Sequence, residues 1–353
     1  MFDHSLLNYD RIPGESGESA WIQRAIDDNP DGVLYIPKGE YAITEPLFIR
    51  NRCSLLMHPN ARLIAAEEMD FVLTYDGNMN FHQLTLFRED GSVYDPLNVF
   101  IKGGDIDGNG KASCLLLANA HHFTLADIAL HNGKKYGLNI GGNLGGRLYE
   151  VVANNVYCKC TQKGLAGNVG IYTNECDEHF TDCFVVDYTV GVQLDGGGNR
   201  LTRVHVWGGT VPPKSMSVEE WSVYYGKNKI INNNGQYTPE LDADILSHGM
   251  PEMLENSVNF LLNSGSNMLE SCYADTATIG YKVIGDNNVL MGCGTFNNRL
   301  MGLRNMLGIE NHAKKLTVTA CTLSKGTESD RHFSGNTEGL IWEYNNIDKS
   351  SIL

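Results

Sequence analysis

A short strand-rich segment recurs along this chain from about residue 97 onward, and this repeat constrains the fold more than any other feature. Each copy opens with a polar residue and an apolar strand. The longer copies then turn at Asn or Asp and enter a second strand at a glycine. Successive second strands start 21 to 23 residues apart, except where a longer loop or insertion intervenes. Units of this length without a helical pattern predict an all-β, right-handed parallel β-helix. The residues of this slot are Gly137, Gly170, Gly191, Ser257, Gly280 and Gly302.

The cysteines follow the same repeat. Equivalent positions in a β-helix stack one strand spacing apart, so cysteines that share a slot should form an internal ladder of small apolar thiols. The chain has nine cysteines, an odd number, which is more typical of buried free thiols in a reducing compartment than of disulfides. Cys158, Cys160 and Cys176 lack the spacing of a zinc site, so no metal is predicted. The cysteines that share one slot are Cys183, Cys272, Cys293 and Cys321.

Charge and terminal sequence exclude several classes of partner. The net charge of the 353 residues is −15, and no Lys/Arg cluster opposes it, so we expect no nucleic-acid partner. The first residues show no basic segment followed by an apolar core, and no apolar run reaches membrane-spanning length. We therefore expect no membrane partner and a cytoplasmic protein or one carried in a phage particle.

Two segments depart from the repeat, and both fit one β-helix domain over residues 1–353. Residues 1–60 predict an N-terminal cap and the first strands, with a short amphipathic helix over 16–28 covering the first coil. Residues 209–256 are too long for a turn and predict an inserted flap. Trp221 and several tyrosines in the flap suggest contact with a substrate or a second subunit. A plain structural insertion is the alternative.

The opening of the chain, WIQRAIDDNPDGVLYIPKGEYAI, and the turn GGDIDGNG at 103–110 resemble a known group of proteins. They are similar to the pectate-lyase-like and glycoside hydrolase family 28-related superfamily of right-handed parallel β-helices. The resemblance implies the fold. It leaves the activity open, since the superfamily includes hydrolases, lyases, epimerases, fructan-cleaving transferases and trimeric phage tailspikes. Within that turn it implies a structural role for Asp105 and Asp107.

The catalytic signatures of polygalacturonases are absent. That family has acidic residues before the glycine of one strand and in the next coil. Here the matching stretches read Lys135-Tyr136-Gly137 and Thr189-Val190-Gly191. Neither a Gly-His-Gly nor an Arg-Ile-Lys motif occurs. The chain is therefore not expected to be a polygalacturonase of the usual kind.

Strand alternation places a polar stripe on the outer face of the second strands. The residue after each glycine should point inward and the next one outward. The resemblance implies that a glycan binds along such a strand face, and a solvated sheet surface is the alternative. The next outward position adds Asn174 and Asp195. The predicted stripe is Asn139, Tyr172, Gln193, Asn259, Lys282 and Arg304.

Cleavage of a glycosidic bond needs one carboxyl group as acid and a second as base or nucleophile. Asp195 with Glu175 is the first candidate pair, and Asp177 and Asp187 are reserves. A lyase would instead need a base and a cation beside a uronate, and the stripe offers Lys282 and Arg304 for that purpose.

Further sugar contacts are predicted outside the stripe. His205 and Trp207 share one outward face of another strand and could hold and stack a sugar, as could Trp221 of the flap. The sequence predicts a carbohydrate-active enzyme acting on a poly- or oligosaccharide, with hydrolase or transferase chemistry preferred and no organic cofactor. The alternatives are a polysaccharide lyase, an inactive member, and a non-catalytic glycan-binding or trimeric, tailspike-like protein.

Overall fold

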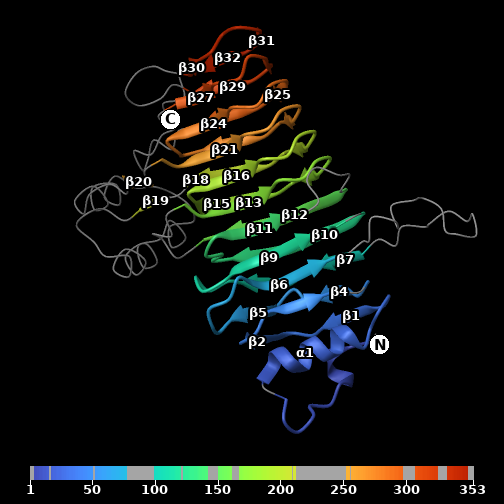
Figure 1. Cartoon of the computed structure of the whole chain (residues 1–353). Coiled ribbons are helices and arrows are strands. Elements are labelled where there is room, and N and C mark those ends of the chain that lie inside the picture. Colours follow the sequence, from blue (N-terminus) through green and yellow to red (C-terminus); the bar gives the residue numbers. More distant parts are fainter. Residues whose placement is uncertain are drawn as a thin grey trace, which may run out of the picture.

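The chain winds into a right-handed parallel β-helix in the computed structural model, with coils stacked from helix α1 at one end to strands β30–β32 at the other (Figure 1). Each coil contributes parallel strands that pair with the coils before and after it. The predicted fold is confirmed. The structure describes residues 4–15, 17–50, 52–77, 99–120, 122–141, 150–160, 167–208, 210–211, 252–254, 256–296, 307–324 and 332–348.

One side of the solenoid is a ten-stranded sheet to which each coil gives one strand. Its strands are β3 (Leu47–Ile49), β6 (Phe71–Asp76), β9 (Ser113–Ala118), β11 (Tyr136–Ile140), β13 (Val169–Thr173), β16 (Val190–Leu194), β21 (Val258–Leu262), β24 (Ile279–Val283), β27 (Leu307–Asn311) and β30 (Phe333–Gly335).

The other sides form one bent, twenty-stranded sheet. Its strands are β1 (Val33–Ile36), β2 (Gly39–Ile43), β4 (Ser54–Met57), β5 (Ala61–Ala65), β7 (Val99–Lys102), β8 (Asp105–Asp107), β10 (Phe123–His131), β12 (Val151–Lys159), β14 (His179–Thr181), β15 (Phe184–Tyr188), β17 (Arg200–Thr202), β18 (His205–Gly208), β22 (Met268–Glu270), β23 (Tyr273–Asp275), β25 (Asn288–Met291), β26 (Gly294–Phe296), β28 (Leu316–Thr319), β29 (Thr322–Ser324), β31 (Leu340–Glu343) and β32 (Asn346–Asp348).

The bend in the large sheet follows a column of residues with positive φ. Asp127, Asn155, Asp182 and Arg203 occupy the same point of successive coils, with φ between 52° and 54°. Asn and Asp tolerate this left-handed conformation better than most residues. Side chains also link the column, because the Asn155 amide donates to Asp127 (2.9 Å) and Arg203 makes two bonds to Asp182 (2.7 and 2.8 Å).

Helix α1 (Gly17–Asp27) covers the first coil, as the sequence predicts. Its apolar side, with Ile22 and Ile26, is buried. Ser19 accepts the backbone N–H of Thr44, and Gln23 exchanges two hydrogen bonds with the backbone of Phe48. The helix thus satisfies backbone groups that would be free at the open end of the solenoid. None of the helices within the described ranges is long and apolar enough to cross a membrane.

The core is a stack of equivalent side chains, and the predicted cysteine ladder is part of it. Strand pairing places the residues after Cys183, Cys272, Cys293 and Cys321 in one column, with Val204 between the first two cysteines. All four side chains are at most 1% exposed. The nine cysteines are free thiols, and eight of them are buried.

Burial makes these thiols unreactive. It raises the pKa of Cys183 to about 11 and that of Cys53 to about 12, so little thiolate exists at pH 8. We expect Ellman's reagent to modify one thiol of the native protein, the partly exposed Cys176, and all nine after denaturation in urea. Cys176→Ser should abolish the native reaction. Rapid labelling of several native thiols would contradict the buried ladder.

Two register predictions were wrong. Ser257 and Gly302 do not occupy the glycine slot, because Phe260 pairs with Val192 and Ile309 pairs with Tyr281. Asn259 and Gly308 therefore occupy this slot in their coils. At Gly191 the reason for a glycine is direct, since a Cβ there would lie 2.1 Å from Val206 Cγ1.

The predicted flap, residues 209–256, lies mostly outside the described residues. Its two ends pair as the short antiparallel strands β19 (Thr210–Val211) and β20 (Glu252–Met253). Trp221 lies outside the described residues, as does Arg304.

Candidate functional site

The predicted polar stripe lies on the outer face of the ten-stranded sheet. Strand pairing sets Asn139, Tyr172 and Gln193 side by side on β11, β13 and β16. Lys282 continues the row on β24, with Leu261 of β21 between it and Gln193. Each of the four polar side chains is partly exposed, whereas the residues that flank it on its strand are buried.

Two residues of the predicted stripe were assigned wrongly. Asn259 is fully buried, and its amide donates to the carbonyls of Val206 and Asp275 (3.1 Å each), so it supports the core and cannot bind a surface ligand. The row continues past Lys282 to Glu310, which occupies the position predicted for Arg304. Lys282 is neutralised there by an ion pair with Glu310 (3.0 Å).

Asp195 and Glu175 are not a pair on one face. Asp195 is exposed and accepts hydrogen bonds from Tyr172 (3.0 Å), Gln193 (3.0 Å) and Asn263 (2.7 Å). Glu175 is 2% exposed, in the turn that follows β13. Alternation along β13 turns Glu175 away from the surface that Asn174 and Asp195 share. A ligand on the outer face therefore reaches Asp195 and not Glu175.

The remaining predicted residues lie elsewhere. Asp177 adopts positive φ in the turn before β14. Asp187 lies on β15 and also has positive φ, and His205 and Trp207 lie on β18. All three belong to the large sheet, on another side of the solenoid. His205 packs edge-on against Phe184 and Tyr273.

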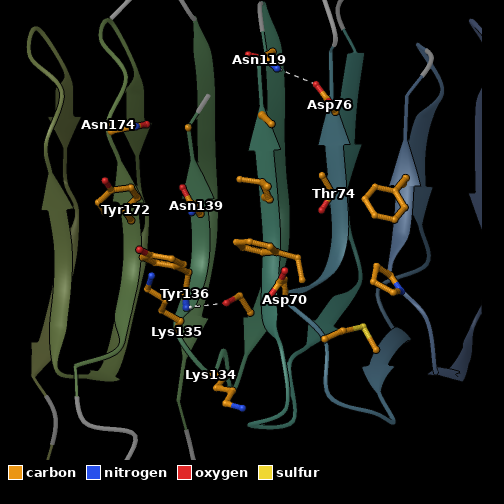
Figure 2. Close-up of a pocket in the computed structure, with 18 of the residues that line it drawn as sticks. Asp70, Thr74, Asp76, Asn119, Lys134, Lys135, Tyr136, Asn139, Tyr172 and Asn174 are labelled. Atoms are coloured by element: carbon orange, nitrogen blue, oxygen red, sulfur yellow. Dashed lines mark hydrogen bonds between the residues drawn. The ribbon is translucent and has the colours of Figure 1, made fainter. Parts of the chain in front are cut away.

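An open groove of about 1280 Å³ crosses the N-terminal half of the ten-stranded sheet (Figure 2). Its floor is formed by strands β6, β9, β11 and β13, and β3 forms one edge. The stripe enters it through Asn139 and Tyr172. The other side chains that Figure 2 labels are Asp70, Thr74, Asp76, Asn119, Lys134, Lys135, Tyr136 and Asn174.

Aromatic rings line one end of the groove. Phe71 and Tyr136 are parallel, with ring centroids 6.4 Å apart across the small Ser113, and Tyr136 is 5.1 Å from Tyr172. Lys135 lies 4.9 Å from the centre of the Tyr136 ring. Partial burial and the neighbouring Asp195 raise the pKa of Tyr172, so its hydroxyl stays protonated and donates.

Polar groups line the rest of the groove. Lys134 pairs with Glu68 (2.5 Å) near the aromatic rings, and Asn119 donates to Asp76 (2.9 Å) at the opposite end. The side-chain oxygens of Asn119 and Asn139 are buried without a hydrogen-bond partner. Unpaired buried acceptors are uncommon in folded proteins, and at a groove they indicate places for ligand donors.

The sequence prediction missed the part of the groove on β6 and β9. The glycine slot is filled by Val72 and Cys114 in these coils, so the repeat that organised the later coils gives no marker here. The sequence marks Lys135 and Tyr136 only by the absence of an acid before Gly137. Their position beside Phe71 follows only from pairing β6, β9 and β11.

The turn at Asp105 and Asp107 has the predicted structural character. Arg62 binds Asp105 (2.8 Å) and Asp107 (2.6 Å) together, and His131 Nδ1 hydrogen-bonds to Asp105 (2.7 Å). Asn132 donates to Asp107 (3.0 Å). This cluster lies on the large sheet, away from the groove. No group of three or more His, Cys, Asp or Glu side chains is placed to hold a metal ion within the described part of the chain.

Comparisons with solved structures find the same fold in other proteins. An endo-xylogalacturonan hydrolase from Aspergillus tubingensis matches with a TM-score of 0.59 and 10% identity, over 96% of this chain and 91% of the enzyme. The enzymatically active domain of tailspike protein 2 of bacteriophage CBA120 matches with a TM-score of 0.59 and 10% identity, over 91% of this chain and 42% of that one. A Geobacillus virus E2 protein, ORF18, matches with a TM-score of 0.55 and 15% identity, over 97% and 60%.

This chain therefore spans less than two thirds of the length of the two viral proteins. Neither a protein-family model nor a curated protein sequence matches it. At such low identities the similarity establishes the class of structure, the parallel β-helix, and no particular activity.

Proposed function

We propose that this protein binds a poly- or oligosaccharide in the groove of the ten-stranded sheet. The main support is that the groove combines three aromatic rings with amide oxygens that have no protein partner. The rings are Phe71, Tyr136 and Tyr172, and the oxygens belong to Asn119 and Asn139. Aromatic faces pack against the apolar faces of sugar rings, and side-chain amides hydrogen-bond their hydroxyls. Similarity to a xylogalacturonan hydrolase and to a phage tailspike supports a carbohydrate-directed role, including a place in a phage particle.

Tyr136 lies at the centre of the ring set, so its loss should be felt most. We expect Tyr136→Ala to weaken glycan binding about tenfold, which corresponds to about 1.4 kcal/mol, the size of a good aromatic contact. Calorimetric titration of the glycan that binds best in a panel of neutral and acidic polysaccharides checks this. Tyr344→Ala is the matched control, since Tyr344 is 88% exposed at the far end of the solenoid. Equal losses in both variants, or no binding to any glycan, would refute the proposal.

Glycosidic cleavage is the second candidate function. Glu68 and Asp70, two residues apart, both line the groove beside the aromatic rings. Asp76 on β6 and Asp195 just after β16 share an outward row four strand spacings apart, or about 19 Å, which is too far for both to act on one bond. Cleavage in the groove would therefore use Asp70 with Glu68, and Asp195 would position the sugar through Tyr172.

The same panel separates these functions. New reducing ends without absorbance at 235 nm indicate a hydrolase, and 235-nm absorbance indicates a lyase. Products with neither signal, seen by mass, indicate a transferase. Binding without products leaves a glycan-binding or tailspike-like protein, for which light scattering would then distinguish a monomer from a homotrimer.

A further inference from the structure

The floor of the groove has a low point at Gly141. One outward row runs Asp76, Ala118, Gly141, Asn174 and Asp195 across neighbouring strands, so the two smallest side chains are adjacent. A Cβ at Gly141 would lie 2.6 Å from Asn174 Oδ1 and 3.2 Å from Asn139 Oδ1. Both amide oxygens therefore lie close to this position, and Figure 2 shows the two side chains on neighbouring strands of the groove floor.

Both atoms are amide oxygens, which can accept a hydrogen bond from a ligand. Asn139 Oδ1 is buried without a hydrogen-bond partner among the described residues, and Asn174 is exposed at the groove surface. A ligand N–H or O–H placed between them would satisfy both oxygens in the conformation observed.

Strand β9, on the side of Gly141 away from Asn174, presents apolar side chains. Leu116 is the neighbour of Asn139 on β9, and Ala118 is the neighbour of Gly141. An anionic substituent is disfavoured here, because the two nearest polar atoms are acceptors and the row ends in Asp76 and Asp195. The point thus offers acceptors for a donor and a small apolar floor for a methyl group.

We propose that this subsite takes the acetamido group of an N-acetylated amino sugar. The acetamido N–H would donate to Asn139 and Asn174, and its methyl group would pack on Leu116 and Ala118. A plain hydroxyl would use only the first of these contacts, and a free ammonium group would lose the second. This inference rests on the proposed function, since it names the sugar class that the same groove selects.

The test compares three tetrasaccharides of one linkage: N-acetylated chitotetraose, its fully deacetylated form and cellotetraose. These carry acetamido, ammonium and hydroxyl groups at the same position. Calorimetric titration should show the acetylated form binding about fourfold more tightly than cellotetraose, because both can make the hydrogen bond and only the acetamido group adds a methyl contact. The deacetylated form separates this contact from the attraction of Asp76 and Asp195 for a cation.

Gly141→Ala supplies the decisive variant. Gly141 does not have positive φ, and the added Cβ meets only the ends of two side chains, so the fold should tolerate it. We expect the preference for the acetylated form to fall to within about twofold, because the added Cβ occupies the place of the acetamido group. His312→Ala is the control, since its side chain is exposed in the same outward row and lies outside the groove lining.

The outcomes are distinguishable. A preference that Gly141→Ala removes and His312→Ala keeps supports the subsite. Equal affinity for the acetylated form and cellotetraose overturns the subsite and leaves the groove intact as a glycan site. The same conclusion follows if only glycans without acetamido groups bind and Tyr136→Ala weakens that binding. Failure to bind any glycan overturns the proposed function and this inference together.

Discussion

Replacing Glu178 with Asn should stabilise the protein, and the gain should grow with pH. Glu178 is fully buried, and its Oε2 accepts the backbone N–H of Val151 (2.7 Å) while Oε1 has no partner. Burial, with smaller contributions from nearby Glu175 and Asp177, raises its pKa to about 9 from an ordinary 4.5. The folded protein therefore holds a proton here that the unfolded chain releases above pH 5.

The neighbouring coils show why Asn fits. Asn199, Asn267 and Asn288 occupy the aligned position in the next three coils, and each accepts the N–H of its neighbour in the coil before, at 2.9 to 3.0 Å. Each also donates to the carbonyl three residues earlier, at 2.6 to 3.0 Å. Glu178 ends this ladder without the second bond.

The sign of the pH effect follows from the raised pKa. The contribution of the protonated Glu178 side chain to stability is complete below pH 4.5 and is lost progressively until about pH 9. A residue that does not titrate removes that loss, so the advantage of Glu178→Asn should grow by about 1 kcal/mol per pH unit between pH 5 and pH 8. Thermal unfolding followed by circular dichroism at pH 5, 6.5 and 8 measures it.

Two controls define the cause. Glu178→Gln, which is neutral and of the same length, should flatten the pH dependence without restoring the ladder. Glu338→Gln removes an exposed carboxylate and should leave it unchanged. A difference between Glu178→Asn and the parent that stays constant from pH 5 to pH 8 would show that Glu178 is ionised in the folded protein.

The repeat was sufficient to predict the β-helix because the residues that recur in it are required for steric reasons. Glycine is required where coils approach closely, as at Gly191, and small thiols stack inside, as at Cys272 and Cys293. The same reasoning failed at Asn259, which fills the glycine slot because its amide finds two backbone carbonyls inside. A polar residue with internal partners has no sequence mark that separates it from one facing water.

The candidate site was predicted only in part, for a related reason. Asn139, Tyr172, Gln193 and Asp195 follow from counting after glycines, and the structure places them on one face. Their partners in the groove come from earlier coils whose register no glycine marks. Glu175 was expected to be available because it lies beside the stripe in sequence, whereas alternation past Thr173 turns Asn174 outward and Glu175 inward.

Arg62→Met should destabilise the protein. Arg62 is the cation between Asp105 and Asp107, whose side chains are 13% and 7% exposed. Removing it leaves two poorly hydrated carboxylates close together, a change that typically costs 3–5 kcal/mol in a fully buried pair. The Arg62 side chain is itself 37% exposed, so we expect about 2–3 kcal/mol at pH 7.

Arg203→Met tests whether geometry or burial decides. Arg203 binds Asp182 through two short contacts (2.7 and 2.8 Å), a geometry as good as that of Arg62, but both side chains are largely exposed. Little change in the free energy of unfolding is expected there, because water screens the pair and solvates the remaining carboxylate. For Arg62→Met, Asp105→Asn in the same chain should restore part of the loss, since it removes one of the stranded charges. Equal effects of Arg62→Met and Arg203→Met in urea unfolding would mean that the Arg62 cluster is no better shielded than a surface ion pair.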